Sequence, residues 1–155
     1  MIIIITGEKR IGKTTLLKKI IKNLEKDIFG IISESFEDGF LVEDLKTKKK
    51  KVLASKNKIG FKLRGYYFDP DAIKFVEKAL EREGEILVYD EIGYLEMRGF
   101  LDIFKYLKNN SIVIVRKDML KDVLENRGDY RVFIVTEENR NFILDEVLAL
   151  CNNVF

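Results

Sequence analysis

The sequence contains no histidine and no tryptophan, and it has only one cysteine, Cys151, and one proline, Pro70. Without histidine, the chain cannot form a histidine-ligated metal centre or a catalytic pair in which histidine activates serine or cysteine. A single cysteine cannot form a disulfide within the chain. The chemistry of this protein must therefore rest on carboxylates, lysines, arginines, hydroxyl groups and backbone amides.

Long apolar runs and a large excess of one charge are also missing. The apolar segment at the N-terminus is about five residues long and has no basic residues before it, so it resembles neither a signal peptide nor a membrane span. The formal net charge is only +2, from 28 basic and 26 acidic residues. Such a balance indicates a surface of mixed sign rather than a dedicated polyanion binder. We expect a cytoplasmic protein without membrane contact, and we favour a monomer.

Apolar strand-like runs alternate with amphipathic helical segments along the 155 residues, 46% of which are hydrophobic. Strands are expected over 2–6, 29–36, 40–45, 86–91, 111–115 and 130–136. Helices are expected over 13–26, from Pro70 to Gly84, over 100–109, in a short segment before residue 130, and after Thr136. This pattern predicts a single domain, 1–155, of the α/β class with a three-layer, largely parallel sheet. The Asp38-Gly39 turn adds an antiparallel hairpin insertion.

Two helix starts carry capping signals. Asp69 can cap the N-terminus of a helix, and Pro70 suits the first turn of that helix. Thr136 can cap the last helix.

The segment GEKRIGKT (7–14) satisfies the pattern G-x-x-x-x-G-K-[ST], and it has the required buried strand before it and amphipathic helix after it. Two glycines permit backbone angles that turn successive N–H groups toward one phosphate, and the helix dipole points at the same place. Lys13 can reach the β- and γ-phosphates, Thr14 can ligate Mg²⁺, and Thr15 is expected to donate to the α-phosphate. The expected nucleotide-binding residues of this loop are Gly7, Glu8, Lys9, Arg10, Ile11, Gly12, Lys13, Thr14 and Thr15.

The segment ILVYDE (86–91) can supply the other half of a hydrolytic site. Asp90 ends an apolar strand, where it can hold the Mg²⁺ together with Thr14. Glu91 follows directly and can orient and deprotonate a water molecule for attack on the γ-phosphate. An Asp-Glu pair favours the branch of P-loop ATPases in which an extra strand separates the two motif strands. We therefore expect strand 111–115 between strands 2–6 and 86–91. If the five parallel strands are numbered along the chain without the hairpin strand 40–45, their expected order across the sheet is 5-1-4-3-2.

The transferring phosphoryl group needs a further cation besides Lys13 and Mg²⁺. The candidates are Arg10, Arg64, Arg116 and Arg140. A guanine-reading N/T-K-x-D motif is missing, because the nearest string, NRGD (126–129), has arginine in place of lysine and precedes its strand. Strong guanine specificity is therefore not expected.

Two other functions remain open at this stage. One is a small nucleotide or nucleoside kinase, although the stretch between strands 86–91 and 111–115 leaves little room for a lid. The other is a nucleotide-dependent RNA-binding module that uses the lysine-rich run KTKKKK (46–51). We interpret that run as a solvated hairpin turn, which makes nucleic-acid binding unlikely without excluding it.

Together, GEKRIGKTT, G-I-I-S-E, YYFDPDAI, VYDEIGYLEM and VTEENRN resemble the THEP1-like nucleoside-triphosphatase family over essentially the whole chain. The resemblance implies a RecA-like sheet and Mg²⁺-dependent hydrolysis of ATP, GTP, CTP and other triphosphates to the diphosphate and phosphate. It also implies low base selectivity. Carried over position by position, it adds Gly93 to Asp90 and Glu91 as a second nucleotide-contacting segment. The sequence departs from the family at Tyr94, where members tend to have lysine, and at Arg116-Lys117, where they tend to have a His-Lys-like pair.

Overall fold

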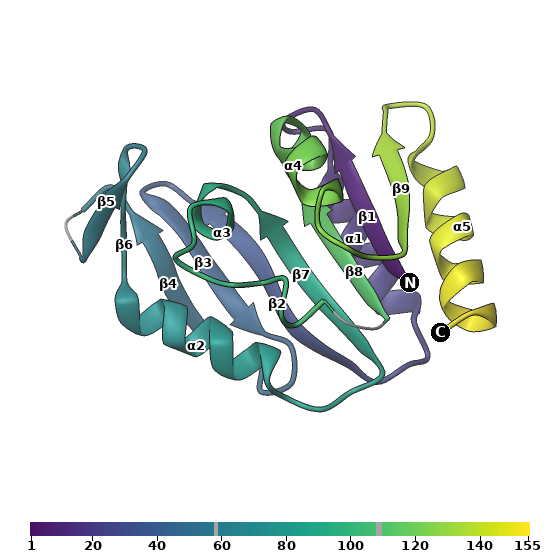
Figure 1. Ribbon diagram of the computed structural model, residues 1–155, viewed down its shortest axis with the longest axis horizontal. Helices are drawn as coiled ribbons and strands as arrows, with labels where there is room; N and C mark the ends of the chain where they lie inside the picture. Colours follow the sequence, from purple (N-terminus) through teal and green to yellow (C-terminus); the bar gives the residue numbers. More distant parts are fainter. Residues whose placement is uncertain (58, 108–109) are drawn as a thin grey trace.

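The computed structural model describes residues 1–57, 59–107 and 110–155, and this part of the chain contains one nine-stranded sheet with helices on both faces (Figure 1). Its strands are β1 (Ile2–Gly7), β2 (Ile28–Phe36), β3 (Gly39–Asp44), β4 (Lys50–Ser55), β5 (Phe61–Leu63), β6 (Tyr66–Phe68), β7 (Ile86–Ile92), β8 (Ser111–Val115) and β9 (Tyr130–Val135). Its helices are α1 (Lys13–Asn23), α2 (Pro70–Leu80), α3 (Tyr94–Met97), the 3₁₀ turn η1 (Lys117–Met119), α4 (Leu120–Leu124) and α5 (Arg140–Asn153). Within the described ranges, no helix has the length and apolar character needed to cross a membrane.

Five strands form the parallel part of the sheet, in the order β2-β7-β8-β1-β9. The expected position of strand 111–115 is confirmed, because β8 pairs with both β1 and β7. Parallel strands bring their carboxyl ends to one edge of the sheet, and ligands bind beyond that edge in such folds. The segments that follow β1, β7, β8 and β9 are therefore neighbours in space.

The antiparallel part of the sheet is larger than the hairpin expected from the sequence. The β2–β3 hairpin is present, but the sheet continues through β4 and β6 to β5. The turn lies one residue earlier than expected, since Phe36 pairs with Gly39 and leaves Glu37 and Asp38 in the turn. Two of the added strands have only three residues each, which is too short for a clear alternation of apolar and polar side chains.

Two apolar clusters cover the two faces of the sheet, and β1 contributes to both. Ile3 and Ile5 pack with residues of α1 and α5, whereas Ile2 and Ile4 pack with residues of α2, α3 and α4. Helices thus cover both faces. A strand buried on both sides is apolar at every position, and this accounts for the run of four isoleucines.

The helix expected over 100–109 is a wrong prediction for the described residues 100–107, which form turns; residues 108–109 lie outside the described part of the chain. The only regular helix near this segment in the described part is the single turn α3. Leu101, Ile103 and Leu107 are buried, but Phe100 is exposed. The apolar residues imitate helical spacing although they pack onto the sheet as an irregular segment.

The predicted cap of α2 is confirmed, whereas the predicted cap of α5 is wrong. The side chain of Asp69 accepts a hydrogen bond from the Asp71 N–H at 2.9 Å, and Pro70 is the first residue of α2, as predicted. Thr136, however, does not cap α5, which begins at Arg140. Instead, the Thr136 N–H donates to Asn139 Oδ1 at 2.7 Å, and Asn139 Nδ2 donates to the carbonyl of Ile134. The asparagine side chain builds a turn that separates β9 from α5.

The lysine-rich segment is an exposed turn that leads into β4, as interpreted from the sequence. Two of its lysines have acidic partners: Lys46 pairs with Asp27, and Lys50 lies within 4.0 Å of both Glu34 and Glu43. These acidic neighbours partly neutralise the positive charge of the segment.

Gly30 on β2 gives a test of the packing between β2 and β7. Its φ is +110°, and a Cβ atom there would lie 2.0 Å from the carbonyl oxygen of Val88. Gly65 also has a left-handed backbone, with φ +84°, but a Cβ there would meet nothing within 4 Å. We expect Gly65→Ala to lower the free energy of unfolding by about 1 kcal/mol and Gly30→Ala to lower it by at least about 3 kcal/mol. Urea unfolding measures both, and equal losses would contradict this account of the clash.

Candidate active site at the carboxyl edge of the parallel strands

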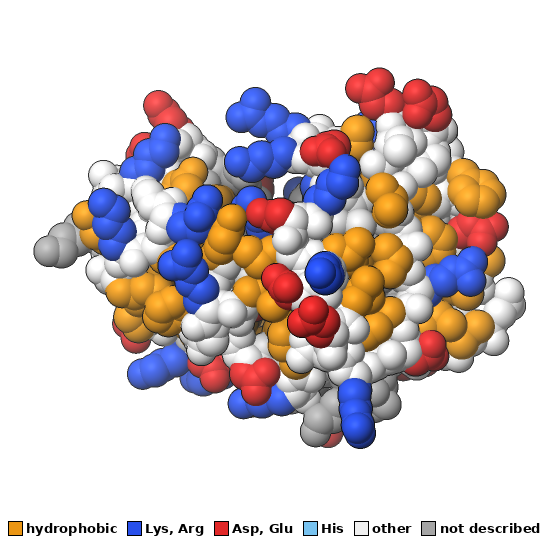
Figure 2. All heavy atoms as spheres, turned by 45° about the horizontal axis from the view of Figure 1, so that its top comes forward, with side chains coloured by type: hydrophobic (Ala, Val, Ile, Leu, Met, Phe, Trp, Pro, Cys, Tyr) orange, Lys and Arg blue, Asp and Glu red, His pale blue; other side chains and the backbone are white. Residues whose placement is uncertain are grey.

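The segments that follow β1, β7 and β8 meet at the carboxyl edge of the sheet, which Figure 2 brings toward the reader. The surface there is hollowed, and several lysine and arginine side chains gather around the hollow (Figure 2). The glycine-rich loop leaves β1 at this edge and enters α1. A surface of this charge suits an anionic ligand.

The two glycines of the loop occupy positions that other residues would not tolerate. A Cβ at Gly7 would lie 2.8 Å from the carbonyl oxygen of Val135, and Gly12 has a left-handed backbone with φ +100°. Lys13 Nζ donates to the carbonyls of Gly7 and Glu8, at 3.0 and 2.8 Å, and thus lies across the loop. Burial lowers the pKa of Lys13, while the carboxylates of Glu91 and Asp90 oppose this shift.

The carboxylate of Asp90 is buried at the end of β7, and it is held from two sides. Thr14 Oγ1 donates to Asp90 Oδ2 at 3.1 Å, and the Ser33 N–H donates to the same oxygen at 3.3 Å. The Ser33 hydroxyl also donates to the backbone carbonyl of Asp90. Burial, with a smaller contribution from Glu91, raises the pKa of Asp90 to about 6. The aspartate expected from the sequence is therefore in contact with the first turn of α1.

Glu91 lies at an irregularity in β7. The pairing with β8 shifts between Asp90, opposite Ile114, and Ile92, opposite Val115, so Glu91 is an extra residue in the strand. The Asp90–Glu91 peptide bond is cis. Tyr89 and Ile92 share one apolar cluster, although strict alternation would place them on opposite faces. A bulge of this kind changes the direction of a side chain at the end of a strand.

Glu91 is partly buried and faces basic side chains. Burial raises its pKa, while Lys13 and then Arg116 act in the opposite direction. The carboxylate therefore lies within the electrostatic reach of Lys13. This is the arrangement expected for a carboxylate that works beside a bound phosphate.

Tyr94 gathers arginines around its ring. The guanidinium carbon of Arg64 lies 4.0 Å from the ring centroid, that of Arg116 lies at 4.8 Å and that of Arg98 at 5.7 Å. Asp118 accepts hydrogen bonds from Arg116 Nε at 3.2 Å and from the Tyr94 hydroxyl at 3.3 Å. Cation–π contacts and one carboxylate thus hold these arginines in place.

The four candidate arginines lie in different places. Arg116 covers Gly93, because its Cδ lies 3.0 Å from where a Cβ of that glycine would be. Arg64 reaches the same region from the β5–β6 turn by stacking on Tyr94. Arg140 lies on the other side of the phosphate loop, where its Nη1 is 3.2 Å from the Cβ position of Gly12. Arg10 is exposed and has a left-handed backbone with φ 62°.

Glu96 is a buried carboxylate below the loop that follows Glu91. Its Oε2 accepts the Gly93 N–H at 3.0 Å, and its Oε1 accepts the Tyr89 hydroxyl at 2.7 Å. Burial raises the pKa of Glu96 from 4.5 to about 7, against the effect of these two hydrogen bonds. Glu96 thereby fixes the backbone of Gly93 next to the site.

The side chains present fit a magnesium ion. Within the described residues, no group of three or more cysteines and carboxylates could enclose a metal ion by itself. A threonine hydroxyl against a strand-end carboxylate is instead the kind of oxygen donor set that holds Mg²⁺ together with substrate phosphates and water. Thr14 and Asp90 would supply these two protein donors, since their oxygens are already adjacent.

Several residues of the site were not anticipated from the sequence. Ser33 was not predicted to hold Asp90; its only signal was its place in the G-I-I-S-E segment, near the expected end of a strand beside β7. Asp118 was not predicted to hold Arg116. The two residues are only two positions apart, and because many surface ion pairs have this spacing, it gave no specific signal. The stacking of Arg64 on Tyr94 joins segments 30 residues apart in the chain and had no local signal.

The glycine-rich loop between a buried strand and a helix, with a strand-end aspartate against its threonine, places the protein among the P-loop NTPases. A family model described as NTPase matches residues 2–148, and the chain belongs to that family. The resemblance found in the sequence is thereby confirmed.

Curated relatives and a solved structure agree with this assignment. The chain is 31% identical to the nucleoside-triphosphatase THEP1 of Aquifex aeolicus (strain VF5), over 97% of this chain and 98% of the relative. It is 30% identical to the nucleoside-triphosphatase THEP1 of Sulfurisphaera tokodaii, over 92% and 90% of the two chains. The crystal structure of THEP1 from Aquifex aeolicus matches with a TM-score of 0.82 and 27% identity, covering 99% of this chain and 100% of that one.

Glu96 predicts a specific pH dependence of stability. Its proton is held more tightly in the folded protein than in the unfolded chain, so its contribution to stability is complete below pH 4.5 and is lost as the pH rises through 7. Glu96→Gln keeps a neutral side chain that can accept from Gly93 and donate to Tyr89. Between about pH 5 and about pH 8, the wild-type protein should therefore lose about 2 kcal/mol more unfolding free energy than Glu96→Gln. Chemical denaturation at both pH values measures this difference, and parallel pH profiles would contradict it.

Proposed function

We propose that the protein is a Mg²⁺-dependent nucleoside triphosphatase that cleaves nucleoside triphosphates to the diphosphate and phosphate. The observation that carries this proposal is the contact between Thr14 of the phosphate loop and Asp90, with Glu91 directly beside it. Membership in the NTPase family and the names of the relatives support it. We also propose that residues 1–155 act as one catalytic domain with a RecA-like parallel sheet.

In this proposal the phosphate loop binds the triphosphate. Its backbone amides and Lys13 neutralise the phosphate oxygens, and Thr15 donates to the α-phosphate. Thr14 and Asp90 hold the magnesium ion, which would neutralise charge on the phosphates when bound. Glu8, Lys9 and Arg10 form the exposed part of the loop around the phosphates, and the half-buried Ile11 packs against the apolar cluster beneath it.

Glu91 acts as the general base. A water molecule attacks the γ-phosphorus in line, a bond from the water oxygen to phosphorus forms, and the bond from phosphorus to the bridging β,γ-oxygen breaks. Glu91 accepts the proton of the attacking water, and the nucleoside diphosphate leaves with the bridging oxygen. Burial raises the pKa of Glu91 and so makes its carboxylate a stronger base than an exposed glutamate.

Among the four candidate arginines, we propose Arg116 as the cation that stabilises the transferring phosphoryl group. It interacts electrostatically with Glu91 and Lys13, and Asp118 and Tyr94 fix its side chain. A pre-positioned cation stabilises developing charge without having to reorganise during the reaction.

The proposed function is tested by phosphate release with ATP, GTP, CTP and UTP, with and without Mg²⁺, and with no acceptor molecule present. We expect Mg²⁺-dependent release from all four. Lys13→Ala should abolish turnover, and Glu91→Gln should bind ATP normally but lose at least about a hundredfold in kcat, because the general base is missing.

The matched control is Glu125→Gln, which neutralises an exposed glutamate at the end of α4 and should hydrolyse ATP like the wild type. Near-normal hydrolysis by Glu91→Gln would remove Glu91 from the mechanism. No phosphate release by the wild-type protein without an acceptor would instead indicate a kinase.

For Arg116→Ala we expect kcat to fall by about a hundredfold with little change in KM, because the arginine acts on charge that develops in the transition state. Arg131→Ala, which removes an exposed arginine of β9, serves as the control. Steady-state kinetics with ATP separates the two parameters. A rise in KM at constant kcat would show that Arg116 binds the substrate equally in the ground state and the transition state, and would contradict the proposed role.

A further inference from the structure

Glu96 is a buried carboxyl group to which the proposed mechanism gives no role. The residue is only 8% exposed, and its two oxygens reach back to β7 on either side of the pair Asp90 and Glu91. One oxygen accepts a hydrogen bond from the Tyr89 hydroxyl at 2.7 Å, and the other accepts one from the Gly93 N–H at 3.0 Å. We call these two hydrogen bonds the Glu96 bridge, because together they span the two carboxylates of the site.

Capping of α3 explains only part of the bridge. Gly93 is the N-cap residue of α3 and Glu96 is its third residue, so the bond to the Gly93 N–H is that of a capping box. A glutamate can cap a helix from the surface, where its carboxylate keeps its hydration, whereas a buried carboxyl group loses it. The second oxygen of Glu96 binds Tyr89, which lies outside α3. The cap therefore accounts for neither the burial of Glu96 nor the bond to β7.

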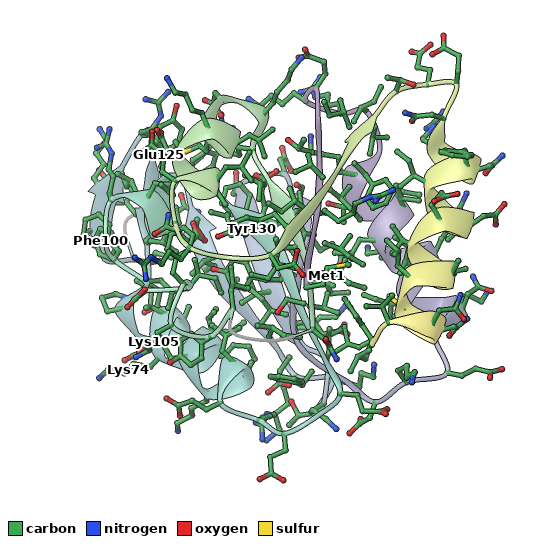
Figure 3. The ribbon with its side chains drawn as sticks, turned by 45° about the vertical axis from the view of Figure 1, so that its right-hand side comes forward. Met1, Lys74, Phe100, Lys105, Glu125 and Tyr130 are labelled. Carbon is green, nitrogen blue, oxygen red and sulfur yellow. The ribbon has the colours of Figure 1, made fainter. Side chains whose placement is uncertain are left out.

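The turn that carries Glu96 is packed firmly onto the sheet. Leu95 and Glu96 are buried, and the chain then reaches the surface at Phe100, which lies at the outer edge of the molecule in Figure 3. The Phe100 N–H donates to the carbonyl of Leu95 at 3.1 Å and closes the segment on itself. Leu95 belongs to the same apolar cluster as Tyr89. Glu96 thus holds β7 from a fixed base.

The part of β7 that the bridge spans contains the bulge at Glu91. Asp90 lies opposite Ile114 and Ile92 lies opposite Val115, which makes Glu91 an extra residue in the strand. A regular ladder defines where each side chain points, but a bulged residue is not held by that register. The bridge fixes the chain immediately before and after the bulge. It therefore supplies a constraint on Glu91 that the ladder with β8 does not.

The bridge also brings a second carboxyl group within electrostatic reach of Glu91. Burial, with a smaller contribution from Glu91, raises the pKa of Glu96 to about 7, against the hydrogen bonds from Gly93 and Tyr89. A carboxyl group that is readily protonated can lie near Glu91 without a full charge repulsion. Glutamine imitates this neutral form, because its side-chain oxygen can accept from one partner while its amide group donates to the other.

We propose that Glu96 is a positioning residue for hydrolysis, which fixes the bulge between Tyr89 and Gly93 and so directs the Glu91 carboxylate at the attacking water. This inference rests on the proposed function, because the water is that of the hydrolytic step. Glu96 does not touch the substrate. Without the bridge, Glu91 is correctly placed for a smaller fraction of the time, which lowers kcat. The phosphate loop after β1 is unchanged, so nucleotide binding is retained.

The test removes the bridge in the presence and in the absence of the Glu91 carboxylate. In steady-state kinetics with ATP and Mg²⁺, Glu96→Leu should lower kcat by at least about tenfold and change KM by less than about twofold. In a Glu91→Gln background, the same substitution should lower kcat by less than about twofold, since the group that the bridge directs is already missing. Glu96→Gln, which can keep both hydrogen bonds, should retain at least about half of the wild-type kcat.

Two further variants separate positioning from a general loss of stability. Tyr89→Phe removes only one hydroxyl group, and it should lower kcat by about threefold when the Glu91 carboxylate is present and not when it is absent. This variant decides the question if Glu96→Leu does not fold. Val76→Ala, on α2, is the matched control, because it opens a cavity in the same apolar cluster. It should lower stability and leave kcat unchanged.

Equal losses of kcat with and without the Glu91 carboxylate would overturn the assignment, and so would an unchanged kcat in Glu96→Leu. Amide hydrogen exchange tests the bridge without turnover: residues 91–93 should exchange faster in Glu96→Leu, whereas β1 should not. If the wild-type protein releases no phosphate but this exchange pattern is found, the proposed hydrolysis is wrong and the bridge still fixes Glu91. Unchanged exchange at residues 91–93 would remove the bridge even in an active hydrolase.

Discussion

The site depends on keeping the carboxylate of Asp90 buried. Removing a carboxylate from water costs several kcal/mol unless hydrogen-bond donors replace the lost hydration. Thr14 on α1 and Ser33 on β2 supply these donors from opposite sides of β7. The contact with Thr14 crosses over β8 and connects the phosphate loop to β7. Because Glu91 is the next residue, the same contact fixes the position of Glu91 relative to the glycine-rich loop.

The basic side chains around Asp90 and Glu91 must be held in fixed positions without losing their positive charge. Tyr94 achieves this for three arginines, since a π face attracts a guanidinium without cancelling its charge. Asp118 compensates only part of the charge, through Arg116. Stacking thus organises the basic side chains at this edge, and Arg64, one of the candidate arginines, reaches Tyr94 from the antiparallel extension of the sheet.

The parts of the fold that could be predicted are those in which a local pattern has one structural reading. Four isoleucines require a strand buried on both faces, and the G-x-x-x-x-G-K-T spacing between a strand and a helix defines the phosphate loop. The Asp-Glu pair was enough to place β8 between β1 and β7. Where the sequence misled, the interaction was tertiary or ambiguous: Ile103 and Leu107 are four residues apart and buried, as on one face of a helix, yet form no helix, and Asn139 takes over the turn at which Thr136 was expected to cap. The bulge at Glu91 leaves no trace in composition, because it exists only in the pairing with β8.

The strand order also separates two of the candidate arginines. Arg116 follows β8 and Arg140 precedes the body of α5 after β9, and these strands flank β1 on opposite sides. The two guanidinium groups therefore lie on opposite sides of the loop that leaves β1, Arg140 against Gly12 and Arg116 against Gly93. Different connections of the same sheet thus hold these two cations, while the contact between Asp90 and Thr14 ties the loop itself to β7.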